Sequence, residues 1–148
     1  MDRKGEPVNV SDIVEIEAIR QLKARYFRFL DTKQWDAWRE VFTEDFRGEI
    51  HGPHPVIHYE NRDEMVEAMR EILAEAPTVH HGHMPEIELT GPDTARGIWA
   101  MEDVVKLGAG FVGYGHYHEE YRKVSGDWRI ARLRLTRLHI EGAEPPAG

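Results

Sequence analysis

Apolar residues return at every third or fourth position through the first helix-length stretch of the chain. This spacing is the apolar stripe of an amphipathic helix. Either Ser11 or Asp12 is suited to cap its start, and the 31–33 segment breaks the stripe. The pattern therefore predicts a helix from about residue 13 to residue 30. Its apolar positions are Ile13, Ile16, Ile19, Leu22, Tyr26, Phe29 and Leu30.

Two shorter helices are predicted further along. The second presents one apolar face, and the third is opened by Asn61 or by the 62–63 pair and closed by Pro77. Between them we expect a short strand over residues 46–50 and a loop over residues 51–55, because proline supplies no ladder N–H. The two apolar faces comprise Trp35, Trp38, Val41 and Phe42, and then Met65, Met69, Ile72 and Leu73.

Four β segments fill the remainder of the chain. They span residues 79–89, 94–106, 111–124 and 128–140, and turn-forming residues separate them. Consecutive strands joined by tight turns pair antiparallel. The expected fold class is α+β, a cone-shaped barrel in which a curved, mostly antiparallel sheet wraps round the long N-terminal helix, with two further helices beside it.

The composition is that of one globular domain. The chain has 148 residues, of which 41% are hydrophobic and 31% charged. We expect residues 1–10 to form a flexible arm, residues 11–141 a single domain, and residues 142–148 a disordered tail. The absence of cysteine excludes disulfides, thiol nucleophiles and cysteine metal sites.

Net charge narrows the class of partner. A formal charge of −8 argues against nucleic acids and anionic membranes, both of which select basic surfaces. No apolar run approaches the roughly 18–20 residues of a membrane helix, and the N-terminus lacks a signal-peptide core. We therefore expect a cytoplasmic protein that binds a small neutral or hydrophobic molecule. No phosphate-binding loop or nucleophile elbow is present, and no cofactor is expected.

Several short sequence segments, taken in order, resemble those of a known family. One closes the first helix (residues 26–31), two follow at 35–38 and 42–45, one opens a strand at 78–81, and the last covers 117–121 with 126–130. Their order and spacing resemble the SnoaL-like group of the nuclear transport factor 2-like superfamily over about residues 10–140. That superfamily includes dehydratases, isomerases, epoxide hydrolases, polyketide cyclases and non-catalytic binding modules.

The branch most similar to this chain is that of scytalone dehydratase and bile acid 7α-dehydratase. The resemblance implies catalytic roles for Tyr26, Asp31, His80 and Asp103, and Arg137 as the match to a C-terminal arginine. It implies a cofactor-independent lyase or isomerase acting on a small hydroxylated or carbonyl compound of steroid, polyketide or terpenoid type. Members of the family usually assemble as homodimers or homotrimers. A binding module, an epoxide hydrolase and a polyketide cyclase remain alternatives.

His80 has a rival in its neighbour. Neutral imidazole accepts a proton near pH 7 and is the usual general base. Strand alternation places His81 on the face of Ile87 and Leu89, whereas His80 faces the other way unless a bulge near Gly82 or Pro85 resets the phase. The family resemblance selects His80, and alternation alone selects His81.

The other candidates carry structural alternatives. Asp103 shares a face with Trp99, and a buried carboxylate needs a partner, so Asp103 is expected to orient His80; the alternative is a surface or structural acid. Tyr26 is either a packed core tyrosine or a donor to a substrate oxyanion. Asp31, at a helix C-terminus, is expected to have a raised pKa as an acid or base. The alternative is that it caps the following helix.

The remaining histidines raise the question of a metal. His80 with His83, or His116 with His118, could present two nitrogens on one side of a strand, but no recognised motif completes either set, so no metal is expected. Either His116 and His118 or Tyr117 and Glu119 should line the pocket. The expected substrate-binding residues are Trp99, Tyr117, His118 and Arg137.

Overall fold

The computed structural model describes residues 9–142, which fold into three helices and six strands. The helices are α1 (Val10–Asp31), α2 (Trp35–Arg39) and α3 (Arg62–Leu73). The strands are β1 (Phe42–Gly52), β2 (His54–Tyr59), β3 (Thr78–Leu89), β4 (Thr94–Val105), β5 (Phe111–Val124) and β6 (Asp127–Glu141). None of the described helices is long and apolar enough to cross a membrane.

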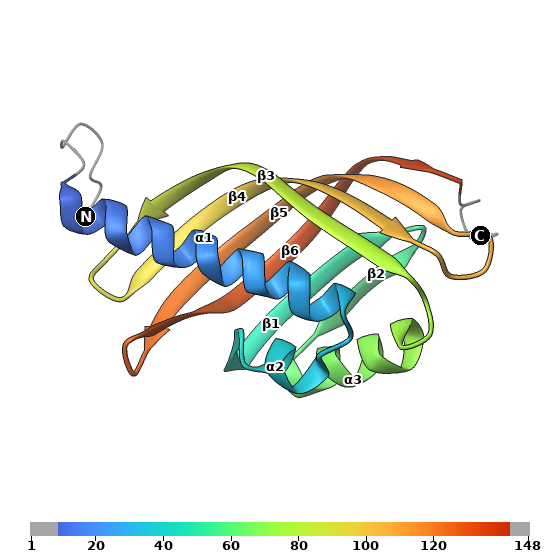
Figure 1. Cartoon of the computed structure of the whole chain (residues 1–148), viewed down its shortest axis with the longest axis horizontal. Helices are drawn as coiled ribbons and strands as arrows, with labels where there is room; N and C mark the ends of the chain where they lie inside the picture. Colours follow the sequence, from blue (N-terminus) through green and yellow to red (C-terminus); the bar gives the residue numbers. More distant parts are fainter. Residues whose placement is uncertain (1–8, 143–148) are drawn as a thin grey trace.

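All six strands belong to one curved sheet, in the order β2-β1-β6-β5-β4-β3. Strands β3 to β6 form the predicted antiparallel meander, and β1 lies parallel to β6. Helix α1 crosses the sheet on one side, while α2 and α3 gather near one end of it (Figure 1). The α+β cone predicted from the sequence is confirmed.

The core lies between α1 and the inner face of the sheet. The first half of the predicted helical stripe remains partly exposed, but Ile19, Leu22, Tyr26 and Leu30 are buried. Aromatic rings fill the space beneath them, in edge and tilted contacts that tie α1 to α2 and β1. Burying such rings stabilises the fold by about 1.5–3 kcal/mol per ring. They are Tyr26, Trp38, Phe42 and Phe46.

The region after α2 differs from the prediction. Strand β1 begins at Phe42 rather than Phe46, and the predicted loop contains the start of a second strand, β2. Pro55 is tolerated there because β2 is an edge strand, where a missing N–H breaks little of the ladder. The prediction of a loop over residues 51–55 was wrong because it treated proline as incompatible with any strand.

The start of α1 also differs. Asn9 is the N-cap, and its side chain accepts a hydrogen bond of 2.9 Å from the backbone N–H of Asp12, so neither Ser11 nor Asp12 caps the helix. Val10 is already helical, which shortens the predicted N-terminal arm. The rest of that arm, residues 1–8, and most of the predicted tail, residues 143–148, lie outside the described residues.

Strand β3 contains the irregularity on which the histidine question depends. Its pairing with β4 shifts between His83 and Glu86, and Met84 adopts a positive φ of 42°. A bulge of this kind adds a residue and reverses the phase of the alternation. As a result Thr78 and His80 face the interior before the bulge, and Ile87 faces the same way after it.

Candidate active site

His80 and Asp31 meet at the end of α1. The final helical residue is Asp31, and the chain turns away at Thr32, so the carboxylate projects over the start of β3. The Nδ1 atom of His80 lies 2.6 Å from Oδ1 of Asp31. The His80 side chain is 8% exposed and that of Asp31 is 21% exposed. The pair is therefore shielded from bulk water without being sealed.

Three donors hold the Asp31 carboxylate. Besides the His80 ring, the backbone N–H of His80 donates to Oδ2 at 2.8 Å, and the Thr78 hydroxyl donates to Oδ1 at 2.9 Å. Lys33 in turn donates to the Thr78 hydroxyl at 2.8 Å. Burial alone would raise the pKa of Asp31, but the hydrogen bonds from His80 and Thr78 outweigh it and hold that pKa below its ordinary value.

This arrangement corrects two expectations for Asp31. The pKa is lowered rather than raised, because the hydrogen-bond donors outweigh burial and the position at a helix C-terminus. Asp31 is also not the cap of the next helix, since the N-cap of α2 is Gln34, which makes no side-chain capping bond.

The bond to Asp31 sets the tautomer of the imidazole. An ionised carboxylate can only accept hydrogen bonds, so Nδ1 of His80 is the protonated nitrogen. In the neutral ring Nε2 then carries the lone pair. Among residues 9–142, no hydrogen bond engages Nε2. His80 is thus an oriented imidazole with a free basic nitrogen.

A second charged pair lies across the strand from His80. Asp103 is the register partner of His80, and it is almost fully buried. Arg137 on β6 holds it in a two-pronged contact, with Nη2 2.9 Å from Oδ2 and Nη1 on Oδ1, and also donates from Nε to the carbonyl of His51 at 2.8 Å. Gly113 on β5 leaves the space for this pair, because a Cβ there would collide with both side chains.

The expected pairing of Asp103 with His80 was therefore wrong. Among the described residues, no hydrogen bond joins the two side chains, although their strands are in register. Asp103 satisfies its charge with Arg137, whose planar guanidinium matches a carboxylate at two points. Asp31 takes the position of the orienting acid instead.

Tyr26 sits deeper, in a buried polar cluster. Its ring lies edge-on to Tyr117, and the ammonium group of Lys23 lies 3.7 Å from the centre of the Tyr26 ring. Lys23 forms a fully buried ion pair with Glu119, 2.6 Å from Nζ to Oε1. Burial raises the pKa of Tyr26, and the negative charge of Glu119 raises it further, so the hydroxyl stays protonated.

The expected substrate-binding residues divide between the two faces of the sheet. Trp99 and Tyr117 are buried on the inner face, and the indole N–H of Trp99 donates to the Tyr121 hydroxyl at 2.9 Å. His118 projects to the outer face, where its Nε2 lies 3.3 Å from the Thr136 hydroxyl. Of the two pairs that could face the interior, Tyr117 and Glu119 do so, while His118 borders a hollow on the outer surface.

Neither of two hollows on the surface is lined by His80 or Asp31. The larger, of about 930 Å³, is bordered by charged side chains from β1 to β6, including Arg47, Glu88 and Arg134. The smaller, of about 570 Å³, lies between α1 and the β5–β6 hairpin, beside Leu22 and Trp128. The His80–Asp31 pair therefore lies apart from both hollows.

Several residues of the site were not predicted from the sequence. Thr78 and Lys33 complete the shell of Asp31, and Lys23 and Glu119 form the buried ion pair. The signal for Lys23 was available, since it lies between Leu22 and Tyr26 on the buried side of the helix. No sequence signal identified Thr78, because its role depends on where α1 ends in space.

The architecture defines a class, the α+β cone proteins, and in this chain a histidine–aspartate pair lies where α1 ends against β3. The SnoaL-like domain model matches residues 11–134, which is most of the chain. This protein belongs to the SnoaL-like domain family.

Similar proteins agree with this placement. A protein of Gibberella zeae named "Probable cyclase FGR4" is 27% identical over 134 residues, covering 82% of this chain and 89% of that protein. A "Putative Scytalone Dehydratase" from Novosphingobium aromaticivorans superposes with a TM-score of 0.81 at 20% identity, over 93% of this chain and 96% of that one. A hexachlorocyclohexane dehydrochlorinase, LinA type 2, gives 0.77 at 19% identity, over 92% and 91%. The two structural likenesses establish the shared fold.

Proposed function

We propose that this protein is a cofactor-independent lyase or isomerase whose general base is His80, oriented by Asp31. The observation that carries the proposal is the short Nδ1–Oδ1 contact of 2.6 Å, which leaves Nε2 unengaged among the described residues. The names of the similar proteins, a cyclase, a dehydratase and a dehydrochlorinase, support chemistry of this type. The proposed substrate is a small hydrophobic hydroxylated or carbonyl compound of steroid, polyketide or terpenoid type.

The proposed reaction begins with proton removal. Nε2 of His80 takes a proton from a carbon next to a carbonyl, and the electron pair of that C–H bond forms an enolate. Asp31 stabilises the imidazolium that results and keeps its ring in place. The lowered pKa of Asp31 suits this role, because the carboxylate must remain ionised while His80 is charged.

The second step is loss of the hydroxyl group. The enolate pair forms the carbon–carbon double bond as the C–O bond breaks, and the His80 proton leaves with the hydroxide as water. Protons and electrons balance within the substrate and the imidazole, so no cofactor is needed. In an isomerase the same proton would return to another carbon.

Arg137 is the proposed electrophilic partner. A guanidinium has five N–H groups. Three of them are donated to Asp103 and His51 within the described residues, which leaves two for a substrate oxygen. Tyr26 is a second proposed donor, since its raised pKa keeps the hydroxyl neutral. Trp99 and Tyr117 would supply the apolar wall beneath the substrate.

Epoxide hydrolysis receives less support than elimination. That chemistry would use two carboxylates about one water, with an arginine between them. Here Arg137 is committed to Asp103, while the bonds of Asp31 go to His80 and Thr78. A histidine base with its own carboxylate favours proton abstraction from carbon.

The test is turnover of a panel of β-hydroxyketones of steroid, polyketide and terpenoid type, followed by product analysis. For the compound that reacts, we expect His80→Ala to lower kcat by about 10²-fold or more, the usual contribution of a positioned base. His116→Ala, on the outer face, is the matched histidine control and should leave kcat unchanged. Full activity in His80→Ala would contradict the proposal. Tight binding without turnover by the unmodified protein would favour the binding module.

A further inference from the structure

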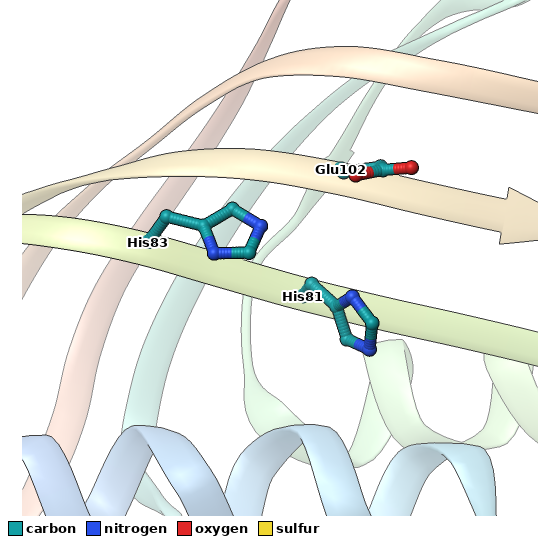
Figure 2. A group of neighbouring side chains, drawn as sticks. All are labelled: His81, His83 and Glu102. Carbon is teal, nitrogen blue, oxygen red and sulfur yellow. The ribbon is translucent and has the colours of Figure 1, made fainter.

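Three metal-ligand side chains gather on the outer face of the sheet. His81 and His83 lie on β3, Glu102 lies on β4, and their ligand atoms all fall within 4.8 Å of one another. Figure 2 shows the two imidazoles projecting from β3 and the Glu102 side chain on the neighbouring strand, β4. Both histidines are exposed and Glu102 is half-buried.

Strand geometry places these residues together. His81 and His83 are two positions apart, so both project from the same side of β3. Glu102 is the register partner of His81, which sets its side chain directly beside them. Both histidines lie in the continuously paired stretch of β3 that precedes its bulge, and His83 is the last residue of that stretch.

We propose that His81, His83 and Glu102 bind one Zn²⁺ ion. Zn²⁺ takes imidazole nitrogens at about 2.0–2.1 Å and carboxylate oxygens at about 2.0–2.2 Å, which puts neighbouring ligands about 3.3 Å apart in a tetrahedron. The ligand atoms lie within 4.8 Å of one another, and we expect rotation of the exposed His81 and His83 side chains to bring them to that spacing. A water molecule would complete the coordination.

The ligand set selects the class of ion. Imidazole suits zinc and its transition-metal neighbours, whereas Mg²⁺ and Ca²⁺ require mostly oxygen ligands. One carboxylate is too few for those hard cations. We therefore expect Zn²⁺ to bind and Mg²⁺ not to compete at equal concentration.

This site is independent of the proposed active site. Its ligands project from the outer face, whereas His80 projects inward toward Asp31. Between the two histidines, the inner side of Gly82 is covered by the ring of Phe27, since a Cβ at this position would collide with it. The ion would bridge edge strand β3 to β4 from outside, so its expected effect is on the stability of the sheet.

The same face carries a matched control. His116 and His118 on β5 repeat the two-residue spacing, and their ring centres lie 6.2 Å apart, close to the 6.0 Å between His81 and His83. His118 already contacts the Thr136 hydroxyl, and among the described residues no third ligand joins this pair. The two pairs share the histidine spacing, and they differ in the carboxylate, in exposure and in the contact that His118 makes with Thr136.

The experiment is titration of the untagged, chelator-stripped chain with ZnCl₂ by calorimetry, with equilibrium dialysis for stoichiometry. We expect one Zn²⁺ per chain, lost in the double variant His81→Ala/His83→Ala and kept in His116→Ala/His118→Ala. Glu102→Gln should bind more weakly, because its amide keeps the shape but lacks the charge. MgCl₂ should give no heat of binding.

Thermal unfolding supplies a second measurement. Zn²⁺ should raise the Tm of the unmodified chain and of the β5 variant, and leave the Tm of the β3 variant unchanged. Circular dichroism of each variant without metal checks that its fold is intact. Undiminished zinc binding by the β3 variant, loss in the β5 variant, or one ion shared by two chains would each overturn the proposal.

Discussion

At the scale of single residues, the site is organised by the hydrogen-bond donors that each of its two carboxylates, Asp31 and Asp103, accepts from. Asp31 and Asp103 stand on either side of His80, yet only Asp31 bonds to the imidazole, because Arg137 occupies the other. A two-pronged guanidinium contact is among the strongest a carboxylate makes. As a result Asp31 orients His80, and Asp103 holds Arg137.

Asp31 should make stability depend on acid pH. Because its pKa is lowered on folding, it stabilises the fold above the unfolded pKa of about 3.9, and this contribution disappears as the pH falls through the lower folded value. We expect Asp31→Asn to cost about 1.5–3 kcal/mol at pH 7, the range for hydrogen bonds to a charged group. Urea unfolding at several pH values measures the difference, which should narrow below about pH 4. A difference that stays constant with pH would contradict this linkage.

Gly113 should be intolerant of a side chain. A methyl group there would collide with Arg137 and Asp103, so we expect Gly113→Ala to cost about 1–3 kcal/mol, as overpacking usually does. The check is a double-mutant cycle with Arg137→Met, followed by chemical denaturation. If the collision is the cause, the cost of Gly113→Ala falls once Arg137 is replaced. Equal costs in both backgrounds would point to the backbone instead.

At the scale of secondary elements, α1 is attached to the sheet at three polar points, the first of which is Glu15 near its start, which accepts hydrogen bonds from Lys123 on β5 and Trp128 on β6. Near its middle, Lys23 reaches Glu119 on β5, and at its end Asp31 reaches His80 on β3. Burial lowers the pKa of Lys23 and raises that of Glu119, while each partner opposes the shift of the other. The pair fixes the helix over the sheet at the expense of desolvating two charges.

Breaking that pair should be costly. We expect Lys23→Met to lower the free energy of unfolding by about 3–5 kcal/mol, because Glu119 would remain buried without its partner. Adding Glu119→Leu should restore much of the loss. The exposed pair of Arg96 and Glu88 is the control, and Arg96→Met should cost no more than about 1 kcal/mol. Similar costs for the buried and exposed pairs, measured by urea unfolding, would refute this account.

Elements with strong periodicity were predictable, and those without it were not. The stripe of α1 and the alternation of the last four strands are local, so the sequence predicts them within a few residues. Strand β2 has an exposed, irregular burial pattern and a proline, which resembles a loop. The phase of β3 depended on a bulge with no glycine at its positive-φ residue, Met84.

At the scale of the whole molecule, the decisive contacts join distant parts of the chain. His80 and Asp31 are 49 residues apart, and Arg137 is 34 residues from Asp103. The family resemblance selected all four residues, but it did not give their pairing. Which of these side chains pair depends on where α1 ends and on the parallel pairing of β1 with β6. No local sequence pattern predicts either feature.

The outer face of the sheet bears on assembly. We expect a homodimer or homotrimer, because an open sheet leaves this face to be covered by another subunit. Partly exposed Ile98 lies on this face, at the border of the larger surface hollow. Sedimentation velocity at several concentrations should show the oligomer, and Ile98→Glu should shift it toward monomer. Glu71→Lys on α3, away from the sheet, is the control. A monomer at every concentration would contradict the expectation.

The bulge in β3 has a consequence for folding errors. A slip of one residue against β4 would turn His81 inward and His80 outward. In the mispaired strand one histidine would still face inward and one outward, so the two histidines alone do not favour the correct register. It would, however, replace Thr78 with Val79 beside Asp31 and remove the hydrogen bond that the Thr78 hydroxyl donates to that carboxylate. Because the strand beyond Met84 follows the opposite phase, such a slip would be arrested there rather than carried to Leu89.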